Sequence, residues 1–307
     1  METCTTTITP KAPFNFDLTA GYHTYFRGSY GSDTLEGGEY RRLLDLDGQL
    51  ALTATRSVGT VAQPKLQVQL WAERLTPAVA ATATSQVAWL LGAAQDLTPF
   101  YEKTQSDPVL ARITEQLYGL HLPHTASVFE ALVLAILGQQ IATNVARIIR
   151  TLLIETFGPS LNHEGTIHHA FPRPETLAAL SVVELRKLTL SQRKAEYVQG
   201  IAQAALEANG PLGRLADLTD DAVVGELTRL RGVGHWTAQW VLVRALGRPD
   251  ALPLGDLALR RVVSSLYFGG EAIADGQLAE FALRWSPYRT FATVYLFSAL
   301  RAGLAEP

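Results

Sequence analysis

The chain is poor in the residues from which disulfide frameworks, metal clusters and membrane anchors are built. Cysteine occurs once in 307 residues, as Cys4, which excludes a disulfide framework and a four-cysteine zinc or iron–sulfur site within this chain. The longest apolar run, Leu132 to Leu137, is far shorter than the ~20 residues of a membrane-spanning helix. Met1 to Pro13 lacks the basic start and apolar run of a signal peptide. We therefore expect a cytoplasmic protein with no membrane partner.

An excess of positive charge is missing as well. The 26 lysines and arginines are outnumbered by 29 aspartates and glutamates, for a net charge of −3. Because a typical DNA-binding domain is basic overall, any interpretation as a DNA-binding protein has to rest on local features. The hydrophobic share of 47% is enough for two or three domains, each with its own core.

The first ninety residues favour β-structure. Two β-rich runs within Tyr40 to Thr55 surround Asp47-Gly48, and such a dipeptide is typical of a tight hairpin turn. Lys65 to Leu70 alternates polar and apolar residues, which predicts a half-buried strand. We expect residues 1–90 to form a small antiparallel sheet with one or two helices.

From about Trp89 the patterns are helical. Start and stop signals predict a helix from Asp107-Pro108 to Gly119, capping boxes at Ser127 to Glu130 and Ser181 to Glu184, and a helix from Ile141 to Phe157. Asn162 to Ala170 is typical of a loop. The whole chain is thus expected to be α+β, with a helical region over residues 91–307.

The most informative stretch is Leu230 to Leu242, in which two apolar helical patterns flank Gly232-Val233-Gly234. The glycines permit a tight turn and a close approach of phosphate to the backbone. The second helix begins near His235 to Thr237, so its free N–H groups and positive dipole end form an anion site. The alternative is an ordinary helix connection with glycine at the C-cap.

Positive charge also concentrates here. Six arginines stand against two aspartates between Arg229 and Arg261. A local basic patch combined with backbone N–H groups would allow an acidic chain to hold DNA.

This stretch resembles the helix-hairpin-helix of DNA-binding proteins, expected over about residues 225–245. A Gly/Pro-rich loop over residues 249–257 follows it and contains Asp256, 22 residues after Gly234. That arrangement resembles the helix-hairpin-helix DNA glycosylase superfamily, in which this aspartate is catalytic. A helix N-cap before Leu257 is the structural alternative for Asp256, and both roles are compatible.

The resemblance extends over nearly the whole chain and is closest to the 3-methyladenine DNA glycosylase II family. It rests further on the segments Pro13 to Gly48, Asp96 to Tyr101, Ser127 to Ala142, Leu190 to Ala195 and Trp285 to Tyr295. It implies an enzyme that flips damaged bases, chiefly alkylated ones such as 3-methyladenine and 7-methylguanine, out of double-stranded DNA. The enzyme would then hydrolyse their N-glycosidic bonds in base excision repair.

One position separates the branches of this superfamily. Members that also cut the backbone carry a lysine two residues after the second hairpin glycine, and its amine forms a Schiff base with the sugar. Trp236 stands at that position. We therefore expect a monofunctional hydrolase without lyase activity.

The resemblance also implies an aromatic base pocket. Its expected lining is Tyr22, Trp236, Trp240, Leu257 and Phe297. A cationic base stacks well on electron-rich rings. Core packing is the alternative for the two tryptophans, which share one helical face. Phe297 and Leu257 depart from a tryptophan and a tyrosine of the family, which favours a roomier pocket.

The residue that fills the gap left by the flipped base is expected to be Gln140, beside Gln139. The family has an apolar wedge here, whereas glutamine can hydrogen-bond the orphaned base. Further DNA contacts are expected from the hairpin region, through Gly232, Gly234, His235, Thr237 and Arg260.

No cofactor is expected beyond a structural Na⁺ or K⁺ on backbone carbonyls, which the resemblance places at Thr228, Leu230 and Val233. The histidines at 163, 168 and 169 lack the spacing of a zinc site and are expected in a solvated loop. A monomer is expected.

Two other functions stay open. One is a non-catalytic lesion-binding protein that uses the hairpin alone. The other is a glycosylase for deaminated or oxidised bases, because this scaffold supports several substrates. The sequence does not rank 3-methyladenine, 7-methylguanine, 1-methyladenine and hypoxanthine.

Overall fold

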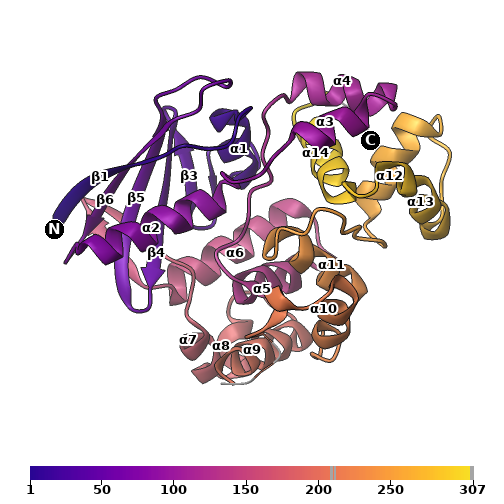
Figure 1. Ribbon diagram of the computed structural model, residues 1–307. Coiled ribbons are helices and arrows are strands. Elements are labelled where there is room, and N and C mark those ends of the chain that lie inside the picture. Colours follow the sequence, from indigo (N-terminus) through magenta and orange to yellow (C-terminus); the bar gives the residue numbers. More distant parts are fainter. Residues whose placement is uncertain (208–209, 211, 305–307) are drawn as a thin grey trace.

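The computed structural model describes residues 1–207, 210 and 212–304. It confirms the α+β class: an antiparallel sheet comes first and a mostly helical region follows (Figure 1). Within the described residues, no helix has the length and apolar character needed to cross a membrane.

The N-terminal sheet has six antiparallel strands in the order β1-β6-β5-β4-β3-β2. Their bounds are β1 Glu2–Ile8, β2 Ser29–Tyr30, β3 Asp33–Glu36, β4 Glu39–Leu46, β5 Gln49–Ser57 and β6 Leu66–Ala72. Helices α1 (Phe16–His23) and α2 (Pro77–Leu90) complete this part, and α2 lies across the strands (Figure 1). The expected small sheet with two helices is therefore present.

The turn between β4 and β5 is the one that the Asp-Gly dipeptide predicts. Leu46 pairs with Gln49, and Asp47 and Gly48 both have positive φ, 51° and 96°. Positive φ at both central positions is the property of a primed hairpin turn. The turn fixes the register that directs alternate side chains of both strands into the core.

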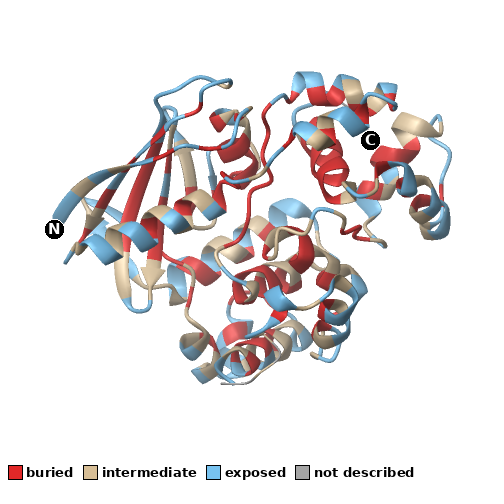
Figure 2. Cartoon of the chain, in the orientation of Figure 1, coloured by how far each residue is buried: buried red, intermediate tan, exposed pale blue. Residues whose placement is uncertain are grey.

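The helical region begins after Leu90. Its helices are α3 Thr98–Thr104, α4 Pro108–Gln116, α5 Val128–Gly138, α6 Thr143–Phe157, α7 Pro174–Ala179, α8 Val182–Arg186, α9 Gln192–Leu206, α10 Asp220–Leu227, α11 His235–Arg244, α12 Leu257–Tyr267, α13 Asp275–Ala282 and α14 Arg289–Arg301. Figure 1 shows α3, α4 and α12 to α14 as one group and α5 to α11 as another. One hydrophobic core continues through both groups, and buried segments occur in each (Figure 2).

The predicted helix starts are confirmed, with one difference in detail. Ser181 and Glu184 form the complete capping box. Ser127 accepts a hydrogen bond from the Glu130 amide, as expected. The Glu130 carboxylate, however, is turned toward Arg42. A charged partner in the buried interior attracts this carboxylate more strongly than a backbone amide does.

The prediction of a loop from Asn162 to Ala170 was wrong. Strands β7 (Ser160–His163) and β8 (Thr166–His169) form a hairpin there, with Glu164 and Gly165 at positive φ in the turn. The hairpin packs against β4 and β5, and the ring of His163 lies 4.6 Å from that of Trp71. An adjacent sheet thus orders a segment whose composition is polar.

Arg42 joins the sheet to the helical region through a buried charge network. From β4 its Nη1 donates to both oxygens of Asp33 on β3, at 2.9 and 3.0 Å. Its Nη2 donates to both oxygens of Glu130 on α5, at 2.8 and 2.7 Å. The Tyr40 hydroxyl also donates to Asp33, and all three charged residues are buried.

Burial raises the pKa of the Asp33 carboxyl group, but the charges of Arg42 and His23 and the hydrogen bonds from Tyr40 and Arg42 together outweigh burial and lower that pKa. A lowered folded pKa means that ionised Asp33 stabilises the fold at neutral pH. This contribution is lost as the pH falls below the unfolded value of about 3.9 and through the lower folded value.

Replacing Arg42 by methionine should destabilise the protein strongly, because two buried carboxylates lose their partner. We expect a loss of roughly 3–5 kcal/mol in the free energy of unfolding at pH 7, measured by chemical denaturation. The difference from the parent should narrow in acid. Arg56→Met is the control, because Arg56 pairs with Glu39 at the surface and such a pair contributes about 1 kcal/mol or less. Equal losses in the two variants would contradict the role of Arg42.

Candidate active site

Asp256 lies at the N-terminus of α12, where both of its predicted roles meet. Its Oδ1 accepts hydrogen bonds from the amides of Ala258 and Leu259, at 3.0 and 3.1 Å. This is the N-cap interaction expected from the sequence. The second oxygen, Oδ2, points away from the helix backbone, so the carboxylate both caps the helix and faces the neighbouring helix α11.

Two indoles on α11 bind that second oxygen. Trp236 Nε1 donates to Asp256 Oδ2 at 3.0 Å, and Trp240 Nε1 donates to the same atom at 3.3 Å. The two indole rings lie 6.5 Å apart in an edge-to-face arrangement. With two backbone and two indole donors, the carboxylate is held in one orientation, which is the condition for preorganised electrostatic stabilisation.

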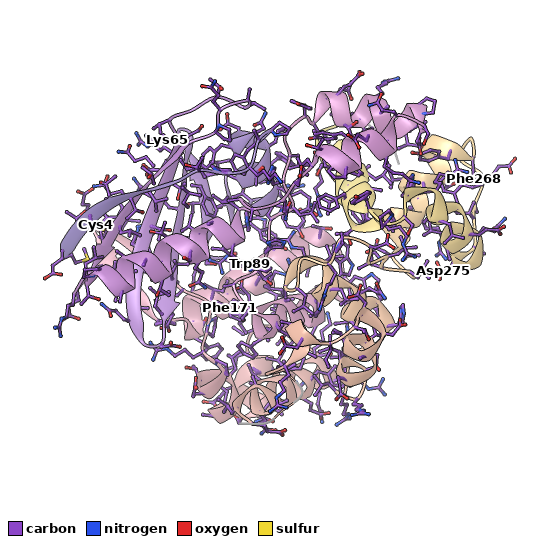
Figure 3. All side chains as sticks on the ribbon, viewed as in Figure 1. Cys4, Lys65, Trp89, Phe171, Phe268 and Asp275 are labelled. Atoms are coloured by element: carbon purple, nitrogen blue, oxygen red, sulfur yellow. The ribbon has the colours of Figure 1, made fainter. Side chains whose placement is uncertain are left out.

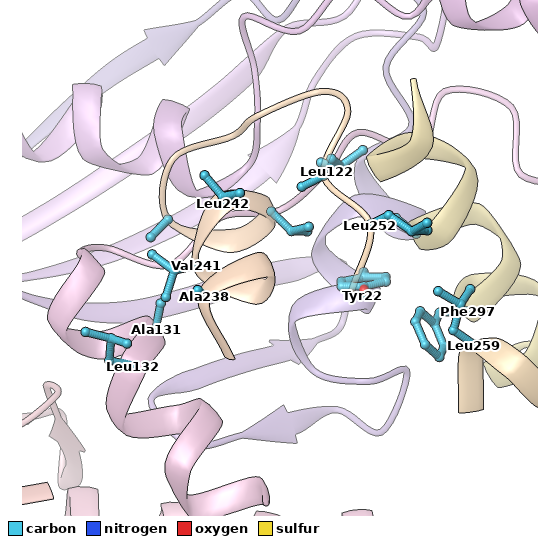
Figure 4. Packing of buried hydrophobic residues seen from close by; sticks show 14 of the residues in the cluster. Tyr22, Leu122, Ala131, Leu132, Ala238, Val241, Leu242, Leu252, Leu259 and Phe297 are labelled. Atoms are coloured by element: carbon cyan, nitrogen blue, oxygen red, sulfur yellow. The ribbon is translucent and has the colours of Figure 1, made fainter. Parts of the chain in front are cut away.

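The residues expected to line the base pocket lie at different depths around this carboxylate. The Phe297 ring on α14 lies 5.9 Å from that of Trp240. Leu257, next to Asp256, is 59% exposed, whereas Phe297 is 5% exposed and Tyr22 only 1%. Tyr22 comes from α1 and belongs to the same buried cluster as Leu252 and Phe297, which Figure 4 labels with it. Tyr22 therefore presents almost no surface of its own to a base.

An arginine cluster lies beside Phe297. It consists of Arg150 on α6, Arg244 at the end of α11 and Arg301 at the end of α14. The guanidinium of Arg301 lies 4.7, 4.0 and 5.7 Å from the ring centroids of Tyr22, Tyr25 and Phe297.

Arg244 lies 5.2 Å from the Tyr22 ring, and Arg150 lies 5.1 Å from the Tyr30 ring. Within the described ranges none of the three guanidiniums is ion-paired with a carboxylate.

The phenol of Tyr25, and not a carboxylate, is the acidic group that lies near these three guanidiniums. Burial raises the pKa of its phenol, but the three guanidiniums outweigh that effect and leave the pKa below its ordinary value. Tyr25 has a φ of 53°, an uncommon value for a residue with a side chain. Two nitrogens of the cluster, Arg150 Nε and Arg301 Nη1, are buried without a hydrogen-bond partner in the described structure. The cluster thus carries unused donors, one of them on the arginine that lies 5.7 Å from the Phe297 ring.

The hairpin between α10 and α11 has its two glycines in different roles. Gly232 has a φ of 90°, and a Cβ there would meet the Tyr197 ring at 2.3 Å. Gly234 has a φ of −94° and caps α11 without a side-chain hydrogen bond, and a Cβ there would meet open space. Of the two glycines that were expected to permit the tight turn, Gly232 alone has a backbone conformation that requires glycine.

The residues after Gly234 divide into exposed and buried. His235 is exposed at the start of α11, where uncapped N–H groups offer the expected anion site. Thr237 is 1% exposed, and its Oγ1 accepts a hydrogen bond from Gln139 at 3.1 Å. The Thr237 side chain is therefore engaged inside the protein and is not exposed for the predicted contact with DNA.

The two glutamines after α5 point in opposite directions. Gln139 Nε2 donates to the carbonyl of Gly232 as well, at 3.1 Å, so this side chain ties the loop to the hairpin. Gln140 is exposed and has a φ of 54°. The structure thus leaves Gln140 free to contact a ligand and uses Gln139 as an internal brace.

The local excess of arginines does not make a free basic patch. Arg229, Arg231 and Arg248 lie 2.8, 3.2 and 3.3 Å from Glu226, Glu196 and Asp220, respectively. Arg260 lies 3.0 Å from Asp275, which stands at the edge of the α12–α14 group (Figure 3). All four acidic partners lie outside residues 229–261. The charge of that segment alone is therefore more positive than the charge of the folded surface around it.

The candidate cation site lies on the segment that joins α10 to α11. Thr228 is the C-cap of α10, and the Leu230 carbonyl accepts a hydrogen bond from the Val233 amide at 3.0 Å. Backbone carbonyls at the negative end of a helix suit a hard monovalent cation. Across the described chain no group of three or more His, Cys, Asp or Glu side chains could hold a metal.

The sequence did not single out Tyr25, Arg150, Arg244 or Arg301 as site residues. Arg301 follows Phe297 by four positions on one helix, so the two share a face. That spacing was a usable signal. The other members come from the segment after α1, from α6 and from α11, and meet only through the tertiary fold.

Comparison with known proteins agrees with this geometry. Residues 133–287 match the family model described as HhH-GPD superfamily base excision DNA repair protein. A DNA-3-methyladenine glycosylase of Bacillus subtilis is 34% identical over 207 residues, which are 67% of this chain and 68% of that protein.

A longer relative and a solved structure extend the match. A probable bifunctional transcriptional activator/DNA repair enzyme AlkA of Mycobacterium tuberculosis is 30% identical over 94% of this chain, which spans 56% of that protein. The structure of a 3-methyladenine DNA glycosylase from Archaeoglobus fulgidus superposes with a TM-score of 0.85. It is 28% identical, and the match covers 97% of this chain and 98% of that one.

The two hairpin glycines give a matched pair of variants. Gly232→Ala should lower the free energy of unfolding by at least about 1 kcal/mol, because alanine disfavours positive φ and its Cβ meets Tyr197. Gly234→Ser should leave stability unchanged or raise it, because serine is a good N-cap. Chemical denaturation of both variants measures the difference. A Gly234→Ser variant as unstable as Gly232→Ala would show that the hairpin backbone differs from this description.

Proposed function

Because the chain belongs to the HhH-GPD superfamily of base excision DNA repair proteins, we propose that it is a monofunctional DNA glycosylase for alkylated bases. It flips the damaged nucleotide out of double-stranded DNA and hydrolyses the N-glycosidic bond, which leaves an abasic site. The observation that carries the proposal is the Asp256 carboxylate, fixed by two backbone N–H donors of α12 and by the indole N–H groups of Trp236 and Trp240.

The chemical step follows from the charge of the leaving base. A 3-methyladenine or 7-methylguanine base carries positive charge and departs without strong acid catalysis. The sugar then gains positive charge, which the ionised Asp256 stabilises, and water attacks the anomeric carbon with Asp256 orienting it. Trp236 occupies the lysine position of the lyases, and an indole nitrogen has no free electron pair for a Schiff base. The abasic strand therefore stays intact.

DNA is held mainly by backbone groups. The uncapped first turn of α11 binds a phosphate, and Gln140 fills the gap that the flipped nucleotide leaves. A Na⁺ or K⁺ ion on the carbonyls of Thr228, Leu230 and Val233 would add positive charge at the hairpin near that phosphate. The proposal is supported by the uncapped helix start and by the exposure of Gln140.

The arginine cluster favours a second candidate substrate class. An unused guanidinium donor, Arg301 Nη1, beside Phe297 suits a neutral base that presents a carbonyl oxygen, as hypoxanthine does. The same positive charge opposes a cationic base. Deaminated or oxidised bases are therefore the alternative to alkylated ones.

Asp256→Asn tests the enzyme against a non-catalytic lesion-binding protein. The change keeps the size of the side chain but removes the charge that stabilises the sugar cation. We expect base release from methylated DNA to fall at least ~100-fold, the scale for one preorganised electrostatic group, while the affinity for DNA is kept. Release of free base and retention of intact abasic strands are followed by chromatography and gel electrophoresis. Near-normal turnover in the variant would move catalysis to another group, and absence of turnover in the parent would favour the binding protein.

A panel of single-lesion duplexes ranks the two substrate classes. It contains 3-methyladenine, 7-methylguanine, 1-methyladenine and hypoxanthine. In Arg301→Met we expect the excision rate of hypoxanthine to fall about tenfold, the equivalent of one charge-assisted hydrogen bond. The rates for the three cationic bases should stay level or rise. Lys103→Met, at an exposed lysine on α3, is the control. Equal changes for neutral and cationic bases would show that the cluster has no part in base choice.

A further inference from the structure

Lys194 clamps the end of the helix that carries Gln140. From the first turn of α9, its Nζ donates to the carbonyl of Leu137 at 3.0 Å and to that of Gln139 at 2.6 Å. These carbonyls belong to the last turn of α5 and its C-cap, where helix geometry leaves acceptors unsatisfied. In the described part of the chain, no carboxylate forms an ion pair with Lys194.

The Gln139 carbonyl belongs to the peptide plane that joins Gln139 to Gln140. Fixing the orientation of this plane fixes the ψ of Gln139 and the φ of Gln140 together. Gln140 has a φ of 54°, a value that costs free energy in a residue with a side chain. A left-handed Gln140 therefore needs an external contact that holds the plane, and the ammonium of Lys194 supplies it.

A second set of contacts holds Gln139 through its side chain. The side chain of Gln139 donates to the Gly232 carbonyl and to Thr237 Oγ1. Its main-chain carbonyl is held by Lys194 on α9, and its side chain is held by the hairpin and α11. Gln140, the next residue, is the first one in this loop that is exposed.

We propose that Lys194 is a positioning residue that presents Gln140 for insertion into the DNA duplex. The inference rests on the proposed function, in which Gln140 fills the gap left by the flipped nucleotide. The ammonium group of Lys194 is partly buried among protein groups. This burial, together with the positive charge of Arg150, lowers the pKa of Lys194. Two carbonyls at the negative end of a helix compensate for that burial.

The test compares paired and single-stranded DNA that carry the same lesion, one that the parent excises. In Lys194→Met we expect the excision rate from paired DNA to fall about tenfold, the equivalent of one charged hydrogen bond. The rate from single-stranded DNA should change less than about twofold, because no gap opens there. Lys187→Met is the matched control, since Lys187 is exposed at the end of α8, and it should match the parent on both substrates.

A double-mutant cycle with Gln140→Ala separates positioning from general stabilisation. If Lys194 acts through Gln140, Lys194→Met should have little further effect in the Gln140→Ala background. Equal losses on paired and single-stranded DNA, or full additivity of the two changes, would overturn the proposal. If Lys194→Met does not fold at the assay temperature, Lys194→Gln, which keeps an N–H donor, is compared in the same way and with the same outcomes.

A binding measurement keeps this inference distinct from the proposed function. A duplex with a tetrahydrofuran abasic analogue opposite 2-aminopurine reports insertion as a change in fluorescence and requires no catalysis. The parent should change the fluorescence, and Lys194→Met should reduce that change as much as Gln140→Ala does. A full fluorescence response in Lys194→Met would overturn the role of Lys194, whatever the catalytic activity. Failure of the parent to excise any lesion would count against the proposed function alone.

Discussion

The buried bridge through Arg42 is the interaction on which the geometry of the site depends. One guanidinium binds Asp33 in the sheet and Glu130 in the first turn of α5. Helix α5 then runs to Gly138, and the loop with Gln139 and Gln140 follows it. Because a helix is stiff along its axis, anchoring its start sets the position of its end. Through this bridge the sheet thus helps to set the position of that loop.

The Asp256 carboxylate is positioned by a different principle. Asp256 caps α12 and accepts two indole hydrogen bonds from α11, so two helices converge on one side chain. Every one of its donors is a rigid group, either a backbone amide in a helix or an aromatic N–H. A residue held in this way needs no rearrangement when charge develops nearby. Of the two indoles, Trp240 also packs against the hydrophobic core.

Much of this was predictable from the sequence, and the exceptions share a cause. The Asp-Gly turn, the helix caps and the hairpin glycines are local signals, and the structure has the elements that they predict. The β7–β8 hairpin was missed because contacts with β4 and β5 order it. The contacts of Arg42 with Glu130, of Lys194 with Gln139 and of Arg301 with Tyr25 were missed because those partners come from distant segments. The different requirements at Gly232 and Gly234 depend on Tyr197, which lies on another helix.

The ion pairs around the hairpin have a consequence for the way the protein would search a chromosome. An arginine that already holds a carboxylate displaces fewer cations from DNA, so binding gains less from counterion release. Four arginines near the hairpin are paired in this way. A grip on undamaged DNA that relied on these arginines would be weaker and less dependent on salt than their number suggests, and each encounter would be brief. A repair protein with short encounters spends little time on intact sequence and passes quickly from one stretch of the genome to the next.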